Sequence, residues 1–339
     1  MRVEEFDYDL PREMIAQHPS GEREASRLLA CDRATGTMEH RRFADVGEYL
    51  REGDVLVIND SKVFPARLKA RKKTGGQLDL LLVRFIGGGT WECLVRGISK
   101  TKDAIPVTLG EYGATLARDN GSWTISFESR EEGDEAIKSL GRMPLPPYIK
   151  RNGEDGSADF DRYQTVYAER TGSIAAPTAG FHFSTELLDR IAARGVEIVK
   201  ITLHIGIGTF SLIHSGPLEE HRMHGERYEL DETAKGRIRA ARQAGRRVVA
   251  CGTSSVRTLE TVFGMSGNGT LAGETELFIY PGYHFHCVDA LITNFHLPRS
   301  TPLMLAAAFM GVEALKRAYA EAIDGGYRFY SYGDAMFIS

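Results

Sequence analysis

The sequence predicts an α/β fold in which an antiparallel β-barrel domain is inserted into a discontinuous layered α/β domain. Six short β-like runs follow one another between residues 63 and 147, separated by glycine-rich turns. Strands alternate with helical segments in the rest of the chain, which is typical of layered α/β domains. The run of short strands ends at a proline-rich segment, because proline interrupts regular structure. This segment contains Pro144, Pro146 and Pro147. We expect an α/β domain of residues 1–62 and 148–339 and a barrel domain of residues 63–147.

The predicted barrel domain consists of closely spaced strands joined by tight turns. The turns include Gly75-Gly76, Gly87-Gly88-Gly89 and Asn120-Gly121. Short strands at this spacing indicate a small antiparallel barrel or sandwich. The strands are expected at residues 66–70, 78–83, 91–95, 105–109, 114–117 and 123–127.

The predicted α/β domain alternates strands with longer helices. Pro302 is well placed at the first position of a helix, a position that proline favours. Strands are expected at residues 54–60, 196–203 and 247–251, with a fourth candidate at 288–293. Helices are expected at residues 184–194, 232–244 and 302–323.

The composition is that of a soluble globular protein that acts inside the cell. The 339 residues carry a formal net charge of −4, so binding to nucleic acid would need a local basic patch. The N-terminus lacks the apolar core of a secretory signal, and no apolar run approaches the roughly 18 residues of a membrane span. The four scattered cysteines argue against a zinc ribbon and a disulfide scaffold. We expect a cytoplasmic, monomeric protein without a membrane partner.

Polar residues follow all four predicted strands of the α/β domain. Ligands of open α/β sheets bind beyond the carboxyl ends of the strands, so four such ends at one edge would form one site if the strands are parallel neighbours. The alternative is that the Ser, Thr and Asn side chains only cap the following helices. The segment 252–257 could also bind an anion at a helix N-terminus, although it is not a Walker A sequence. The polar residues are Asn59 and Asp60, Thr202 and His204, Thr253, Ser254 and Arg257, and Asn294 and His296.

Histidines gather in the segment 219–226, which contains His221, His224 and Glu226. Imidazole and carboxylate groups are zinc ligands, so a metal site is one interpretation. The spacing is not that of a zinc-protease helix, and we favour a loop whose histidines bind substrate or structural partners. His284 and His286 are expected to point to opposite faces of a strand.

Two basic segments are candidates for RNA contacts. The alternation in residues 67–71 puts three charges on one strand face, and residues 235–246 repeat basic residues at helical spacing. Clusters of one sign on an acidic protein suggest contacts with a phosphate backbone, although a solvated charged face is the alternative. The candidate RNA-binding residues are Lys69, Arg71, Lys72 and Lys73 in the first segment, and Lys235, Arg239, Arg242 and Arg246 in the second.

The motifs together resemble those of the S-adenosylmethionine:tRNA ribosyltransferase-isomerase family of queuosine biosynthesis. They extend over nearly the whole chain, and several are long and distinctive. The fit is loosest in residues 96–102, where family members usually show a stretch rich in proline and lysine. The matching motifs lie at residues 6–11, 15–19, 26–29, 57–68, 144–149, 163–168, 175–183, 202–210, 221–226, 252–253, 257–260, 293–298 and 332–336.

The resemblance implies an α/β domain with an inserted β-barrel and a defined reaction. S-adenosylmethionine would be a substrate rather than a methyl donor, with no bound cofactor and no metal. Its ribosyl moiety would be transferred and isomerised onto 7-aminomethyl-7-deazaguanine at the wobble position of tRNA. The products would be epoxyqueuosine-tRNA, adenine and methionine.

This chemistry requires a base, an acid that protonates the departing adenine, and groups that hold both substrates. Histidine has a suitable pKa, and a carboxylate is the alternative. The candidate catalytic residues are His182, His204, His224, His296 and Asp60. The candidate substrate-binding residues are Asn59, Arg67, Tyr148, Thr178, Thr253, Ser254, Arg257 and Asn294. Two other functions stay open: a metal-dependent hydrolase centred on residues 221–226, and an RNA-binding protein without catalysis.

Overall fold

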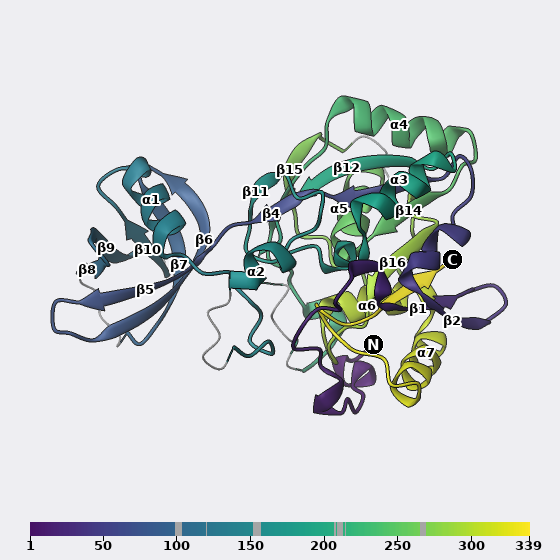
Figure 1. Ribbon diagram of the computed structural model, residues 1–339, viewed down its shortest axis with the longest axis horizontal. Coiled ribbons are helices and arrows are strands. Elements are labelled where there is room, and N and C mark those ends of the chain that lie inside the picture. The colour runs from purple at the N-terminus through teal and green to yellow at the C-terminus, as the bar shows by residue number, and fades with distance from the viewer. Residues whose placement is uncertain are drawn as a thin grey trace.

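The computed structural model has two lobes, a small barrel and a larger α/β lobe (Figure 1). It describes residues 1–98, 104–119, 121–151, 157–206, 208, 213, 215–264 and 269–339. Residues 99–102 of the loosely fitting segment, Ile207, and the last two residues of the 202–210 motif lie outside these ranges. The predicted fold class is confirmed, because a mixed sheet covered by helices accompanies a closed antiparallel barrel of six strands.

The small lobe is a barrel whose six strands all pair antiparallel in the order β10-β7-β6-β5-β8-β9, with β9 and β10 closing it. Strands β5 and β6 alternate buried and exposed side chains, so one face of each fills the barrel interior. Leu68, Leu80 and Leu116 are among the side chains buried there. The strands are β5 (Arg67–Lys72), β6 (Gln77–Gly87), β7 (Thr90–Arg96), β8 (Ile105–Leu109), β9 (Tyr112–Asp119) and β10 (Ser122–Ser126).

A helix that the sequence analysis did not predict, α1 (Arg130–Leu140), packs against the barrel. The Ser129 hydroxyl caps it by accepting from the Glu132 amide at 3.1 Å. A Cβ at Gly133 would come within 2.4 Å of the Trp91 ring, so the helix packs closely only because this residue is glycine. The Ser-x-x-Glu pattern was a usable signal for the start of this helix.

The large lobe is built on a nine-stranded sheet of order β15-β13-β12-β3-β14-β16-β17-β1-β2. Its central strands β12, β3, β14 and β16 are parallel neighbours. Four of the strands match the predicted ones closely. The bounds are β1 (Arg27–Cys31), β2 (Met38–Arg42), β3 (Val55–Asn59), β12 (Glu197–Leu203), β13 (Glu226–Glu229), β14 (Val248–Cys251), β15 (Ala272–Thr275), β16 (Ala290–Asn294) and β17 (Ala335–Ile338).

Helices cover both faces of this sheet. Val55 and Val57 of β3 face a core shared with α4 (Glu232–Gln243), α5 (Thr253–Phe263), α6 (Thr301–Met310) and α7 (Val312–Asp324). Leu56 and Ile58 face a second core, shared with α3 (Thr185–Ala193) and the 3-10 helix at Phe43–Glu48. Strand alternation therefore divides the side chains of each central strand between an α5 face and an α3 face.

Two predictions for this lobe were wrong. The helix expected at residues 302–323 is two helices, because Gly311 has a φ of 91° and ends α6 before α7 begins. His284 and His286 lie in an irregular segment before β16 rather than on a strand. Glu260 accepts hydrogen bonds from the backbone amides of His286, Cys287 and Val288, which holds this segment in a non-strand conformation.

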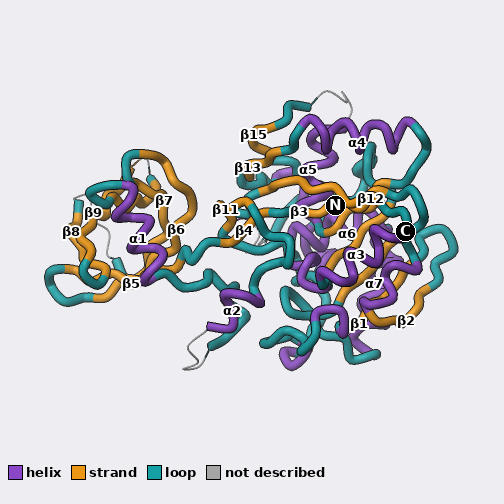
Figure 2. Tube along the Cα trace, turned by 45° about the horizontal axis from the view of Figure 1, so that its top comes forward, coloured by secondary structure: helices purple, strands orange, loops and turns teal. Residues whose placement is uncertain are grey.

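Two chain segments connect the lobes, and the barrel stands apart from the sheet (Figure 2). On the way out, β4 (Ser61–Val63) pairs parallel with β11 (Arg170–Ser173). On the way back, Arg142 exchanges backbone hydrogen bonds with Arg67. The helix α2 (Ser157–Arg162) follows in the large lobe. The exact division at residues 63 and 147 stays a prediction.

Candidate functional site

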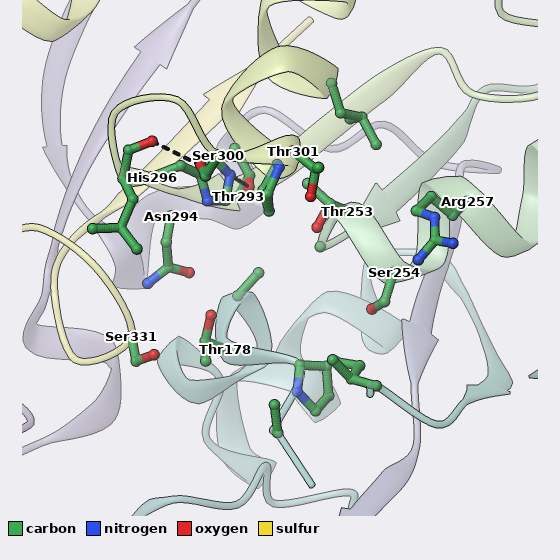
Figure 3. A pocket seen from close by; sticks show the side chains of 18 of the residues that line it. Thr178, Thr253, Ser254, Arg257, Thr293, Asn294, His296, Ser300, Thr301 and Ser331 are labelled. Atoms are coloured by element: carbon green, nitrogen blue, oxygen red, sulfur yellow. Dashed lines mark hydrogen bonds between the residues drawn. The ribbon is translucent and has the colours of Figure 1, made fainter. Parts of the chain in front are cut away.

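A pocket lies at the carboxyl ends of the four parallel strands, as the sequence analysis expected if these strands were neighbours. One wall is the first turn of α5 after β14, and the opposite wall is the segment after β16 (Figure 3). Apolar residues such as Leu277, Phe278 and Leu297 complete it. Its polar lining residues include Tyr148, Tyr163, Thr178, Glu226, Thr253, Ser254, Arg257, Thr293, Asn294, His296, Ser300, Thr301 and Ser331.

The polar strand ends divide between the two faces of the sheet. Asn59 lies on the α5 face and donates to Ser254 Oγ at 3.1 Å, directly behind the pocket. Asp60 and His204 lie on the α3 face, away from the pocket. Asp60 accepts a hydrogen bond from Thr202 Oγ1 at 2.6 Å, and burial raises the pKa of its carboxyl. Burial lowers the pKa of His204. Two candidates for the base, Asp60 and His204, therefore do not line the pocket.

The Asn59 side chain joins two strands and a helix. Its amide nitrogen also donates to the Leu203 carbonyl at 3.0 Å, and its oxygen accepts from the Leu203 amide at 3.0 Å and the Ser61 amide at 3.1 Å. All the hydrogen-bonding capacity of the amide is used in this way. Asn59 thus positions Ser254 and leaves no group for a ligand.

The first turn of α5 presents backbone amides to the pocket. Gly252 has a φ of 87°, which turns the chain sharply from β14 into the helix. Within the described residues, no side chain caps this helix N-terminus. Thr253 and Ser254 both line the pocket at this point. The free amides and the helix dipole favour an anionic group here.

Arg257 lines the same wall, but its charge is already neutralised. Its guanidinium is buried and forms an ion pair with Glu226. It also donates to the carbonyls of Leu277 at 2.9 Å and Thr275 at 3.0 Å. Glu226 in turn accepts from the Gly206 amide at 2.9 Å. Arg257 therefore holds the pocket wall together, and the helix N-terminus is the better anion site.

His296 is the imidazole that lines the pocket among the described residues. Its Nε2 lies 2.7 Å from Thr293 Oγ1, and its backbone amide donates to the Tyr319 hydroxyl at 2.8 Å. The Tyr8 hydroxyl donates to its carbonyl oxygen. Burial lowers the pKa of His296 to about 3, so the ring is neutral at physiological pH. The ring is thus a fixed, neutral hydrogen-bonding group.

Tyr148 and Asn294 form the wall near the barrel side of the pocket. The Tyr148 hydroxyl lies 2.7 Å from Ser331 Oγ, and its ring packs 4.8 Å from that of Tyr330. Burial raises the pKa of Tyr148 to about 12, so the hydroxyl stays protonated. Asn294 donates to the Tyr330 carbonyl at 3.0 Å. Both predicted residues lie in the pocket with Thr178.

His182 lies behind the pocket, in the core of the α3 face. It is buried against Phe43, and its Nδ1 lies 2.7 Å from Ser26 Oγ. Burial lowers its pKa to about 4, opposed by the Asp334 carboxylate and the Asn294 side chain. His182 does not line the pocket, so it is not placed to touch a ligand there.

The remaining candidate residues lie elsewhere. His224 is exposed, and Glu226, its neighbour in the histidine-rich segment, is paired with Arg257. Across the described residues, no group of three or more His, Cys, Asp or Glu side chains is arranged to hold a metal ion. Arg67 and Lys69 line a cleft between the lobes, with Arg71, Lys72 and Lys73 farther along β5 and its turn.

The predicted basic stripe of α4 points away from the pocket. Lys235 donates to the Gly269 carbonyl at 2.7 Å, and Arg242 donates to the His286 carbonyl. Arg246 donates to the Gly53 carbonyl at 3.1 Å, close to where β3 begins, whereas the pocket lies where β3 ends. Arg239 is exposed on the same helix. Three of the four side chains thus bind backbone carbonyls of the lobe.

Sequence reasoning missed several pocket residues. Tyr163 opens one of the matching motifs, and Ser331 directly precedes another, so the motifs themselves were a signal. Ser300 caps α6, with its Oγ accepting from the Leu303 amide at 3.4 Å, which the helix-start pattern indicated. Thr293 opens the matching motif at residues 293–298, which was a signal of the same kind.

A sheet-edge pocket with a helix N-terminus and a fixed imidazole is the kind of site found in enzymes of the α/β class. A family model described as "Queuosine biosynthesis protein" matches residues 3–338. The chain therefore belongs to the queuosine biosynthesis protein family, and it is a transferase-isomerase. This confirms the family resemblance inferred from the motifs.

Relatives of this family match over the whole chain. A protein of Symbiobacterium thermophilum is 49% identical over 346 residues, and one of Thermotoga petrophila is 47% identical over 341 residues; in both cases 100% of each chain is covered. Both are named S-adenosylmethionine:tRNA ribosyltransferase-isomerase. The crystal structure of S-adenosylmethionine tRNA ribosyltransferase from Thermotoga maritima matches with a TM-score of 0.57 and 37% identity, covering 99% of this chain and 100% of that one. Among the described residues, no helix has the length and apolar character needed to cross a membrane.

Proposed function

We propose that this enzyme transfers and isomerises the ribosyl moiety of S-adenosylmethionine onto 7-aminomethyl-7-deazaguanine at the wobble position of tRNA. The products are epoxyqueuosine-tRNA, adenine and methionine. Support comes from the names of full-length relatives about half identical to this chain. The observation that carries the proposal is the pocket at the ends of β12, β3, β14 and β16, which combines an anion-binding helix end with a neutral imidazole. We place this activity in the cytoplasm, in a monomer without a bound cofactor.

The pocket suits a zwitterionic nucleoside. The methionine carboxylate binds the backbone amides at Thr253 and Ser254, where the helix dipole favours negative charge. The adenine ring packs on the apolar side chains of Phe278 and Leu297. The sulfonium does not meet a free cation, because Arg257 is already paired with Glu226. A pocket with unpaired arginine would repel this substrate.

The sulfonium acidifies the C–H bonds beside it, and the imidazole of His296 takes the proton from the ribose 5′ carbon. The C–H electrons stay on that carbon as a stabilised ylide, the ring opens, and the bond to adenine breaks. The imidazolium then gives its proton to the departing adenine. Ring opening breaks the C4′–O bond, which leaves a C4′=C5′ vinyl sulfonium and a C1′ aldehyde. The tRNA amine adds to C4′ and loses a proton, which regenerates the ylide at C5′. This carbon attacks the C1′ aldehyde to close a five-carbon ring, and the new alkoxide displaces methionine from C5′ to form the epoxide, with methionine leaving with the sulfur electron pair. Burial keeps the His296 imidazole unprotonated in the free enzyme, and the hydrogen bond with Thr293 fixes the ring.

The metal-dependent hydrolase and the non-catalytic RNA-binding protein are separated from this proposal by one assay. The protein is incubated with S-adenosylmethionine and tRNA that carries the 7-aminomethyl-7-deazaguanine base. We expect adenine release that depends on the tRNA, together with a mass gain of the tRNA. Adenine release that stops on chelation and returns with zinc would support the metal enzyme instead. Bound tRNA without any adenine release would support the binding protein.

A further inference from the structure

A cleft of about 560 Å³ lies between the barrel and the large lobe. Strands β5, β6 and β7 of the barrel form one side. The other side is formed by the returning segment at Arg142 to Ile149 and by residues Arg151, Asp159 and Phe160. The reaction chemistry described above uses none of these residues.

The barrel side of the cleft is the outward face of three adjacent strands. The register pairs Arg67 with Leu81 and Leu81 with Leu94, and it pairs Lys69 with Asp79 and Asp79 with Arg96. Strand alternation turns all six of these side chains to the same face. The cleft surface therefore combines an apolar row with a charged row.

Positive charge prevails in this cleft. Four exposed cations, Arg67, Lys69, Arg96 and Arg142, stand against the single carboxylate of Asp79. In the part of the chain that the structure describes, none of the four forms an ion pair within 4.0 Å. Arg151 and Asp159 pair with each other at 2.7 Å and add no net charge. Such an excess of unpaired cations favours a polyanion.

The cleft also exposes two large apolar side chains, which are unfavourable on a surface that contacts only water. Leu94 is 47% exposed and Phe160 is 44% exposed. The neighbouring Asp159 is held by Arg151 and by the Tyr332 hydroxyl at 3.0 Å, so Phe160 stands on a fixed backbone. An exposed aromatic ring beside cations suits the stacking of an unpaired base.

The cleft and the pocket share one wall. Tyr148 and Tyr163 line the pocket, whereas Ile149 and Phe160 line the cleft. Consecutive residues, Tyr148 and Ile149, thus face the two hollows. A nucleotide chain lying in the cleft needs to cross only this wall for an extruded base to enter the pocket.

We propose that this cleft binds the single-stranded anticodon loop of the substrate RNA, with Arg67, Lys69, Arg96 and Arg142 contacting phosphates and Phe160 stacking on a base. This inference rests on the proposed function and names the surface that holds its RNA substrate. The proposal also separates the basic residues at positions 67–73 of the barrel into two groups. Arg67 and Lys69 contact RNA, whereas Arg71, Lys72 and Lys73 lie outside the cleft and do not.

The test measures binding of the full-length protein to a synthetic RNA hairpin over a range of KCl concentrations. The cleft variant combines Arg96→Gln and Arg142→Gln, and the matched control combines Lys72→Gln and Lys73→Gln in the same barrel. Each phosphate contact contributes about 0.7 to the slope of log affinity against log salt for single strands. The cleft variant should lose about 1.4 of this slope, while the control keeps it. Phe160→Ala should weaken binding about tenfold with an unchanged slope.

Three results would overturn the proposal. The control variant could lose as much slope as the cleft variant, the cleft variant could bind like the wild type, or a blunt duplex could bind as tightly as the hairpin. Thermal unfolding of each variant verifies that it is folded. Failure of the proposed function looks different. In that case the wild type releases no adenine from S-adenosylmethionine, whatever the cleft variants do to RNA affinity.

Discussion

The arginine side chains of the pocket and of the cleft differ in burial and in ion pairing. In the pocket, Arg257 is buried, paired with Glu226 and saturated by backbone carbonyls. In the cleft, Arg96 and Arg142 are exposed, and of the two carboxylates that line it, Asp159 is already paired with Arg151. The pocket therefore recognises a compact zwitterion through dipoles and neutral groups, whereas the cleft attracts a polyanion through net charge. The same residue type provides rigidity in one place and long-range attraction in the other.

The largest expected effect comes from the neutral imidazole of the pocket. His296→Gln keeps a hydrogen-bonding side chain but removes the base, so adenine release should fall by about 10²- to 10⁴-fold. The matched control, His284→Gln, changes an exposed histidine outside the pocket and should keep wild-type turnover. Single-turnover adenine release measures both. Near-normal turnover of His296→Gln would remove this residue from the mechanism.

The next effect tests whether Arg257 is structural. Arg257→Ala removes the guanidinium that neutralises the buried Glu226 carboxylate, so the free energy of unfolding should fall by about 3–5 kcal/mol. The exposed pair of Arg170 and Glu229 offers a control, and Arg170→Ala should cost less than about 1 kcal/mol. Urea denaturation measures both changes. Equal, small losses would show that the Arg257 pair is no more than a surface ion pair.

A smaller effect concerns the buried His182. Above pH 6.5 the imidazole is neutral in the folded and unfolded protein. As the pH falls from 6.5 towards 4, the His182 imidazole is protonated in the unfolded chain but stays neutral in the folded protein. The free energy of unfolding therefore decreases over this range. The loss at this site is at most about 3 kcal/mol. Urea denaturation at about pH 7 and about pH 5 should show a smaller decrease in His182→Asn than in the wild type.

The outcome that contradicts this prediction is an equal decrease in both proteins. His40→Asn is the control, because His40 lies on the edge strand β2 and is partly exposed beside Glu321.

The smallest expected effect is that of salt on the affinity of the pocket for S-adenosylmethionine. Affinity for S-adenosylmethionine should change less than about twofold between about 50 and about 200 mM KCl, because the pocket binds through dipoles and paired charges. Affinity for RNA should fall at least about tenfold over the same range. Isothermal titration calorimetry gives the first value, and fluorescence anisotropy the second. A steep salt dependence of S-adenosylmethionine binding would indicate an unpaired cation in the pocket.

The sequence predicted the six barrel strands and the four central parallel strands of the large lobe, because their apolar runs and glycine turns are local signals, but it did not predict β1, β2, β13, β15 or β17. The sequence analysis also expected one site if the four predicted strands were parallel neighbours. The strands β12, β3, β14 and β16 meet this condition. The sequence analysis did not predict α1, whose buried residues are mostly small, or the break at Gly311.

The candidate site was harder to predict because two of its determinants are not local. Asn59 and Asp60 are adjacent in sequence but lie on opposite faces of the sheet, and the helix that covers each face comes from distant segments. From the sequence alone, Arg257 is a candidate anion ligand. Its ion pair with Glu226, which is 31 residues away in the sequence, is visible only in the structure. The cleft joins residues from β5, β7 and α2, so its charge excess is visible only in the folded chain.

Steady-state kinetics of the Arg96→Gln and Arg142→Gln double variant test the division between pocket and cleft most directly. Loss of two phosphate contacts should raise the KM for tRNA by about tenfold or more. The KM for S-adenosylmethionine and kcat should stay at wild-type values, because neither arginine lines the pocket. An equal rise in both KM values, or a loss confined to kcat, would contradict this division of roles.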